Sequence, residues 1–196
     1  MSPVSRYHPV LVALHWLLAF FIIAALALGA LVLARLHNTD PMKIEALRSH
    51  MIGGLLILVL MLARLFVRTR TAHPTAATTG NRDLDRLAWL SHRLLYIVAL
   101  ALPVSGFFMA FQTDLPSIVL AGHGALPADF WAYPIRWVHY ALTRLLMALI
   151  ALHILGALYH TLILRDGLLR RMFFGRRTRP ATSVAAAKPS LSGTQP

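Results

Sequence analysis

Four long apolar stretches alternate with short polar segments along this chain of 196 residues. The first lies between Arg6 and Arg35, where 28 consecutive residues include no Lys, Arg, Asp or Glu. A helix of that length is long enough to cross the hydrocarbon core of a bilayer, which is about 30 Å thick. Because the apolar core of a signal peptide runs only about 7 to 15 residues, we interpret this stretch as a retained membrane span.

The other three apolar stretches also predict membrane-spanning helices. Asp40 and Pro41 are typical of a helix start, since Asp caps the first turn and Pro fits its first position. Pro103 and Gly106 are expected to bend the third span. The predicted spans cover residues 9–35, 41–68, 87–111 and 134–164.

The remaining segments have the composition of loops and of a tail. Residues 69–83 read as a loop, and residues 112–133 as a longer loop with a short interfacial helix. Residues 176–196 are rich in Ala, Pro, Ser and Thr and predict a disordered tail. The sequence therefore predicts an all-α, integral membrane four-helix up-and-down bundle within residues 1–175.

Charge adds an orientation to this bundle. The chain is 58% hydrophobic and 13% charged, yet its net charge is +12. The basic residues cluster between apolar runs and do not line one polar face, which argues against a nucleic-acid partner. With the N-terminus inside, the inner segments hold fourteen Lys and Arg residues and the outer loops hold four. The positive-inside rule then places both termini in the cytoplasm.

Histidine is the only soft metal ligand present in quantity, since the chain has ten histidines and no cysteine. The missing cysteines exclude disulfides, thiolate-held iron-sulfur clusters and covalently attached c-type haem. His139 and His153 are 14 residues apart, close to four helical turns, and therefore share one face of span four. His15 lies near the inner level of His153, and His50 near the outer level of His139. Topology and helical rise thus predict two bis-histidine sites stacked across the bilayer.

Two facing imidazoles suit a b-type haem better than a zinc ion, because zinc needs three or four protein ligands and the macrocycle supplies four nitrogens itself. Gly53, Gly54 and Gly156 lie beside the ligands and would let a flat macrocycle approach, although small residues are also typical of plain helix packing. The haem propionates need basic partners. The candidates for this role are Arg64 on the inner side and Arg48, Arg136 and Arg144 on the outer side.

Four segments carry a resemblance to a known family. They are ALHWLLAF around His15, SHMIGGLLILVLMLARLFVR around His50, SHRLLYIVALALPVSG around His92 and VHYALTRLLMALIALHILGALYHTLILRDGLLRRMF. The histidine positions, the His-Trp pair and the Leu-Pro-x-x-Gly turn recur together between Tyr7 and Phe174. In these features the chain resembles the bacterial cytochrome b561 family.

The resemblance implies a dihaem b electron carrier of the bacterial inner membrane, with His15 and His153 on one haem b and His50 and His139 on the other. Related proteins oxidise superoxide at the periplasmic side and reduce ubiquinone, so we expect a superoxide:ubiquinone oxidoreductase. The expected partners are membrane lipid, superoxide and quinone, with no stable protein partner. A haem b anchor that passes electrons between a partner dehydrogenase or hydrogenase and quinone is an alternative, and a small membrane transporter is a second one.

Further residues are candidates for contact with the reacting molecules. Arg48 and Arg136, on the outer side, would attract the superoxide anion. His160 follows His153 by seven residues on nearly the same helix face and lies nearer the cytoplasm, where it would hydrogen-bond a quinone carbonyl or relay a proton. His92 is a second candidate for that role, and Asp166 would connect His160 to water. The simpler alternative for both histidines is an amphipathic ring at headgroup depth.

Overall fold

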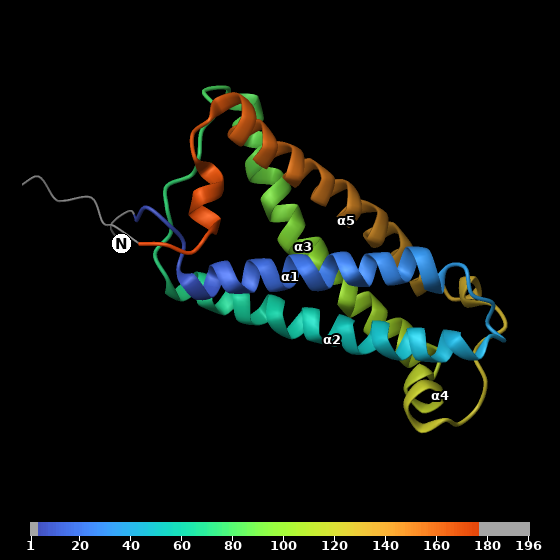
Figure 1. The fold of residues 1–196 in the computed structure, drawn as a ribbon. Coiled ribbons are helices and arrows are strands. Elements are labelled where there is room, and N and C mark those ends of the chain that lie inside the picture. The colour runs from blue at the N-terminus through green and yellow to red at the C-terminus, as the bar shows by residue number, and fades with distance from the viewer. Residues whose placement is uncertain (1–3, 177–196) are drawn as a thin grey trace, which may run out of the picture.

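The computed structural model describes residues 4–176, and these residues form a bundle of long helices without strands (Figure 1). The all-α prediction is thereby confirmed. The long helices are α1 (Pro9–Ala27), continued by the π-helical segment η1 (Leu28–Leu33), α2 (Pro41–Arg70), α3 (Arg82–Gln112) and α5 (Pro134–Leu158), continued by the π-helical segment η3 (Tyr159–Leu164). All four are long and apolar enough to cross a membrane. The predicted tail, except Arg176, lies outside the described residues.

Capping side chains decide where the helices begin. The Asp40 carboxylate accepts a hydrogen bond from the amide of Met42, 2.8 Å away, at the start of α2. Asn81 accepts from the amides of Asp83 and Leu84. Helix α3 therefore begins at Arg82, ahead of the apolar span expected from Leu87, because the cap and not the hydrophobic boundary starts the helix.

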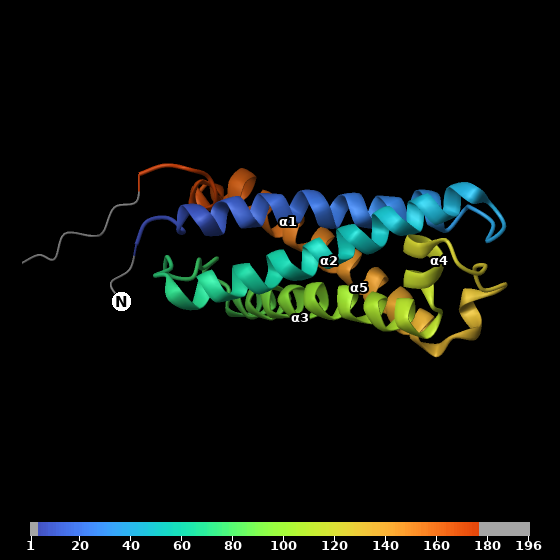
Figure 2. The same cartoon turned by 90° about the horizontal axis from the view of Figure 1, so that it is seen from below.

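The helices associate as two antiparallel pairs. Helix α1 packs along α2, α3 packs along α5, and α2 also contacts α3 (Figures 1 and 2). The start of α1 and the end of η3 lie at one end of the bundle, which we call the termini end. The other end holds the short helix α4 (Leu115–Ala121) and the turn η2 (Phe130–Ala132), and we call it the α4 end.

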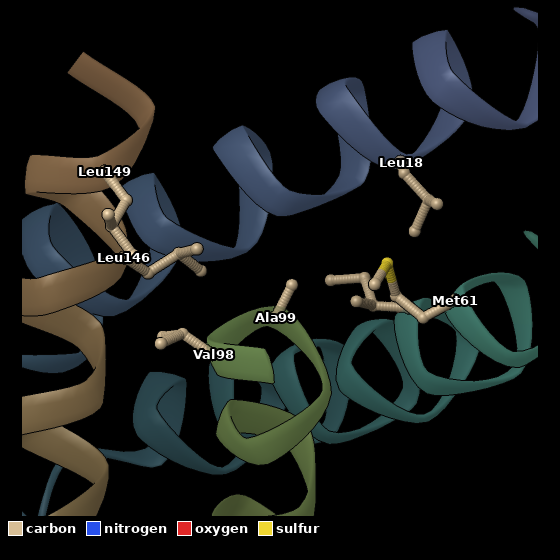
Figure 3. Close-up of a cluster of buried hydrophobic side chains, with 7 residues drawn as sticks. Leu18, Met61, Val98, Ala99, Leu146 and Leu149 are labelled. Carbon is tan, nitrogen blue, oxygen red and sulfur yellow. The ribbon is translucent and has the colours of Figure 1, made fainter. Parts of the chain in front are cut away.

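An apolar layer fills the middle of the bundle between the two ends. Figure 3 shows the side chains that meet there from all four long helices: Leu18, Met61, Val98, Ala99, Leu146 and Leu149. Leu146 is only 2% exposed. It lies seven residues from both His139 and His153, so all three share one face of α5. This apolar layer therefore lies between the level of His139 and the level of His153 along the bundle.

Each end is closed by a short segment. At the α4 end, Leu115, Ile118 and Val119 pack on Leu47 and Ala110 in a second apolar cluster. At the termini end, the 3₁₀ turn η4 (Leu168–Met172) lies against the start of the chain. There the indole of Trp16 donates to the carbonyl of Met172, at 2.8 Å, and the amide of Tyr7 donates to the carbonyl of Arg171.

Candidate functional site

Two pairs of histidine rings meet inside the bundle, at different levels. The rings of His15 on α1 and His153 on α5 have centroids 6.2 Å apart, with planes at 70°. The rings of His50 on α2 and His139 on α5 have centroids 6.3 Å apart, with planes at 75°. These are the two couples that topology predicts. Each joins a helix of the α1–α2 pair to α5, so the imidazoles face one another across the boundary between the two helix pairs.

The ring separation fits a shared metal ion. An imidazole nitrogen binds a transition metal at about 2 Å, so two rings on opposite sides of one metal have centres about 6 Å apart once the ring radii are added. Among the described residues no group of three or more His, Asp or Glu side chains converges on one metal position. The donor set therefore fits a group that supplies its other metal ligands itself, as a porphyrin does.

A hydroxyl group fixes the orientation of His139. Ser105 is 4% exposed, and its Oγ donates its only hydrogen to the carbonyl of Leu102 at 2.7 Å. The same Oγ lies 2.9 Å from Nδ1 of His139, so it must accept from an Nδ1–H group. Nε2 is then the nitrogen with the free electron pair, as a metal ligand requires. Sequence reasoning missed Ser105, although it lies within the Leu-Pro-x-x-Gly turn.

Glycines let the helices approach the rings at the α4 end. A Cβ atom on Gly106 would stand 3.2 Å from Cε1 of His139, and one on Gly29 would stand 3.6 Å from Cε1 of His50. Gly29 lies in the π-helical segment η1, and sequence reasoning missed it too. The glycines named from the sequence have open space beside them, since no atom lies within 4 Å of a Cβ built at Gly53, Gly54 or Gly156.

A buried arginine lies near the pair at the termini end. Arg64 is 7% exposed, and it donates to the carbonyl of Leu11 at 2.6 Å and to the Tyr96 hydroxyl at 3.0 Å. Its charge acts on both His15 and His153. Both hydrogen-bond partners are neutral, and none of the ion pairs between described residues includes Arg64. A buried cation without a carboxylate is costly, which fits an acidic group bound beside this pair, such as a haem propionate.

His92 is a third ring at the same level. Its centroid lies 5.1 Å from that of His153, and the planes stand at 85°. Nδ1 of His92 lies 2.6 Å from the carbonyl of Ala88 and therefore donates to it. The side chain is exposed, in contrast to the partly buried rings of His15 and His153.

The basic residues predicted for the outer side have different surroundings. Arg48 pairs with Glu45 at 2.8 Å and donates twice to the carbonyl of Val119, so it holds α4 on the bundle. Arg136 lies over the ring of Trp131, 4.4 Å from its centroid, and its charge acts on both His50 and His139.

Two further cations, Lys43 and Arg144, differ in burial. Lys43 is 8% exposed and donates to the carbonyl of Leu36 at 2.7 Å, and the charge of Arg136 also acts on it. Arg144 is exposed on α5. Of the three arginines predicted for the outer side, Arg136 is the one whose charge acts on a histidine pair. Arg48 makes a structural contact with α4, and Arg144 lies on the surface.

The buried ring of His160 forms a dyad with the exposed carboxylate of Asp166 at the termini end. His160 is 8% exposed, and its Nδ1 lies 2.6 Å from Oδ2 of Asp166. The backbone turns back at Arg165 and Gly167, which both have positive φ, and this turn carries Asp166 towards η3. The hydrogen bond with His160 holds the pKa of the Asp166 carboxyl below its usual range, and the Leu168 amide acts in the same direction.

Comparison with known proteins gives a consistent set of relatives. A sequence model of a family described as prokaryotic cytochrome b561 matches residues 6–175. A probable superoxide oxidase CybB of Yersinia pestis is 28% identical over 178 residues, which cover 88% of this chain and 98% of that protein. Cytochrome b561 homolog 1 of Escherichia coli (strain K12) is 28% identical over 180 residues, covering 88% of this chain and 99% of that protein. Cytochrome b561 homolog 2 of the same organism is 27% identical over 177 residues, covering 86% and 91%.

Proposed function

The chain belongs to the prokaryotic cytochrome b561 family of membrane haem b electron carriers, and we propose that it takes electrons from superoxide at the α4 end and delivers them to ubiquinone at the termini end. The observation that carries this proposal is the presence of two histidine pairs at two levels of one bundle, each with one ring on α5 and with ring separations of 6.2 and 6.3 Å. The name of the Yersinia pestis relative, a probable superoxide oxidase, supports the choice of donor.

Two b-type haems are the proposed cofactors. His15 and His153 would hold one, and His50 and His139 the other. When bound, a haem iron supplies reversible one-electron transfer. The chain itself provides the ligands, fixes the Nδ1–H form of His139 through Ser105 and keeps the two levels apart with the apolar layer around Leu146.

The proposed reaction needs different chemistry at the two ends. Two superoxide anions lose one electron each and become dioxygen, and no proton is exchanged. One quinone gains these two electrons together with two protons and becomes quinol. The donor end therefore has to attract an anion, whereas the acceptor end has to supply protons.

The α4 end suits the anion. The charges of Lys43 and Arg136 interact with each other there, and Arg136 also acts on both rings of the local histidine pair. A cation close to the histidine pair raises the local concentration of a small anion there and its rate of encounter. This attraction weakens with added salt. Arg48 contributes charge to the same end, although its guanidinium is held by Glu45 and Val119.

The termini end suits the quinone. His160 lies seven residues beyond His153 along α5 and η3. Its Nδ1 is hydrogen-bonded to Asp166. Its Nε2, when protonated, is then the nitrogen that can donate a hydrogen bond to a quinone oxygen. The excess of basic residues in the segments at this end supports its placement in the cytoplasm, with the α4 end at the periplasmic face of a bacterial inner membrane.

Purified protein and superoxide test this function without any partner enzyme. We expect a reduced-minus-oxidised spectrum of six-coordinate b haem, haem reduction when superoxide is generated in the cuvette, and quinol formation when ubiquinone is added. Superoxide dismutase should abolish both steps. Haem that is reduced only through a partner dehydrogenase or hydrogenase would contradict the proposal in favour of the anchor. A colourless, iron-free protein would contradict the haem sites themselves and return the transporter to consideration.

A further inference from the structure

One carboxylate is hydrogen-bonded to His160, and a second lies within range of its charge. The whole chain has only seven acidic residues, and three of them, Asp83, Asp85 and Asp166, lie at the termini end. Asp166 contacts His160 directly at 2.6 Å. Asp85, in the first turn of α3, lies close enough for the charge of His160 to act on it. Because the segments at this end are strongly basic, the presence of two acids near one buried imidazole is unusual.

The dyad leaves one ring nitrogen available. An ionised carboxylate only accepts hydrogen bonds, so Nδ1 of His160 donates to Oδ2 of Asp166. The amide of Leu168 donates to Oδ1 of the same carboxylate at 2.9 Å, which holds Asp166 in place. No protein hydrogen bond to Nε2 occurs within the described part of the chain. With the ring 8% exposed and anchored through Nδ1, proton exchange with a bound molecule takes place at Nε2.

Asp85 is held in a fixed position. Its Oδ1 accepts from the amide and the hydroxyl of Thr79, at 2.8 and 2.9 Å, and its Oδ2 accepts from the hydroxyl of Thr78 at 2.6 Å. These bonds tie the loop after α2 to the start of α3. Arg171 donates to the carbonyl of Thr75 in the same loop, at 2.8 Å, and its charge acts on Asp166. These contacts hold the segments that carry Asp85 and Asp166 at the same end of the bundle as His160.

We propose that Asp166 positions His160 and stabilises its protonated ring, and that Asp85 draws protons from water at the termini end towards it, so that His160 delivers protons to the quinone. This proposal rests on quinone reduction as the proposed function. Nε2–H of the imidazolium gives its proton to a quinone oxygen as the quinone gains an electron, and water returns a proton to the ring. The transfer occurs twice for each quinol formed, so two protons balance two electrons.

The two carboxylates serve this cycle in different ways. Asp166 pairs with the imidazolium that forms in each proton transfer, as the carboxylate beside a catalytic histidine does, although Asp166 is itself exposed. Asp85 adds negative charge at the water interface and raises the local proton concentration. The other groups facing His160 are the ring of Tyr159, 6.3 Å away between centroids, and Arg171 through its effect on Asp166.

The experiment compares two oxidants of the same chemically reduced holoprotein. A soluble ubiquinone takes up protons with its electrons, whereas ferricyanide takes electrons alone. Haem oxidation is followed by rapid mixing across a range of pH. Asp166→Asn and Asp85→Asn are the variants, and Asp83→Asn is the matched control, since the exposed Asp83 pairs with Arg86 at 3.5 Å and contacts neither His160 nor the Thr78–Thr79 turn. Asp166→Glu keeps the carboxylate in case the Asn variant fails to fold.

We expect Asp166→Asn to slow oxidation by quinone about 100-fold at neutral pH, the lower range for loss of a positioned proton-transfer group. Asp85→Asn should slow it severalfold, and both variants should lose rate at a lower pH than the wild type. Asp166→Glu should recover part of the rate. Oxidation by ferricyanide and the haem spectrum should be unchanged in every variant.

Three results would overturn the inference. Wild-type rates with quinone in both Asn variants would leave quinone reduction standing and remove the carboxylates from it. Equal slowing with quinone and with ferricyanide would show a structural defect and not a proton defect. Wild-type protein that ferricyanide oxidises and quinone does not would remove the proposed function together with the inference.

Discussion

The two ends of the bundle hold nearly the same pair of imidazoles in different chemical surroundings. The ring separations differ by only 0.1 Å between the pairs, 6.3 Å at the α4 end and 6.2 Å at the termini end. An arginine charge acts on both rings of each pair, Arg136 at the α4 end and Arg64 at the termini end. Beyond His15 and His153 lies a histidine bound to a carboxylate, with a second carboxylate nearby.

This difference separates the features that the two ends share from those in which they differ. The helix spacing and the shared face of α5 suffice to place two metal-binding couples. In the proposed function, the neighbouring charges then distinguish the two ends, with an anion that exchanges no proton at one and a proton-consuming acceptor at the other. Each of the following substitutions alters one end of the bundle and leaves the other end as an internal control.

Removing one ligand gives the largest expected effect. We expect His50→Ala to lose the haem at the α4 end and His15→Ala to lose the haem at the termini end, each lowering haem content from two per chain to one. His15 is the better choice at the termini end because His92 lies beside His153 and offers another imidazole. Haem quantification and reduced-minus-oxidised spectra measure the loss. His123→Ala, in an exposed loop, is the control.

Loss of both haems from either change would contradict the pairing, provided that the variant keeps the helical content of the wild type. The two single variants should also differ from each other. The spectrum of His50→Ala should show only the haem of the termini end, and that of His15→Ala only the haem of the α4 end, because each pair holds its own cofactor.

Arg64→Gln should weaken haem binding at the termini end by about 10- to 100-fold, the range for groups that support metal ligands. Among the described residues, Arg64 is the only buried cation whose charge acts on His15 and His153. Haem retention during dilution measures the effect, and the haem at the α4 end should stay. Arg68→Gln is the control, since Arg68 stacks on the same Tyr96 ring at 5.7 Å without being buried. Equal losses in both variants would point to Tyr96 instead.

Ser105→Ala should have a smaller effect at the opposite end, about tenfold weaker haem binding. The variant removes the acceptor of the His139 Nδ1–H bond and leaves the Leu102 carbonyl as an imperfect substitute. Ser91→Ala is the matched control on the same helix, because Ser91 is also buried and also donates to a backbone carbonyl, that of Ala88. A loss confined to the termini-end haem would contradict this role of Ser105.

Arg136→Gln should slow haem reduction by superoxide only severalfold, since steering by charge changes the encounter rate and not the chemistry. The variant should also flatten the dependence of that rate on salt. Rapid-mixing rates at several ionic strengths measure both. Arg144→Gln removes the same charge from an exposed position on α5 and should change the rate less. Equal effects of the two substitutions would mean that net charge alone attracts the anion.

The sequence predicts those features that depend on one helix or on topology. Helical periodicity places His139 and His153 on one face, and the alternation of spans brings His15 and His50 to the matching levels. The cap at Asp40 can likewise be predicted from local chemistry, and the structure has it. Such features need only the spacing of residues along a single element.

Contacts between distant segments escaped prediction. Ser105 supports His139 only because α3 and α5 pack with those two faces together, which spacing along either helix does not determine. The approach of Asp85 to His160 depends on how the loop after α2 ties to the start of α3. Arg48 has the charge expected of an anion-binding residue, yet a backbone carbonyl of α4 holds it.

Haem content per chain, measured on protein purified from cells well supplied with iron and haem precursor, tests the central claim most directly. Two b-type haems per polypeptide, both six-coordinate, are the predicted result, because two imidazole couples stand at two levels of the bundle. A single haem, or a haem with one open coordination position in each chain, would contradict the account of two bis-histidine sites.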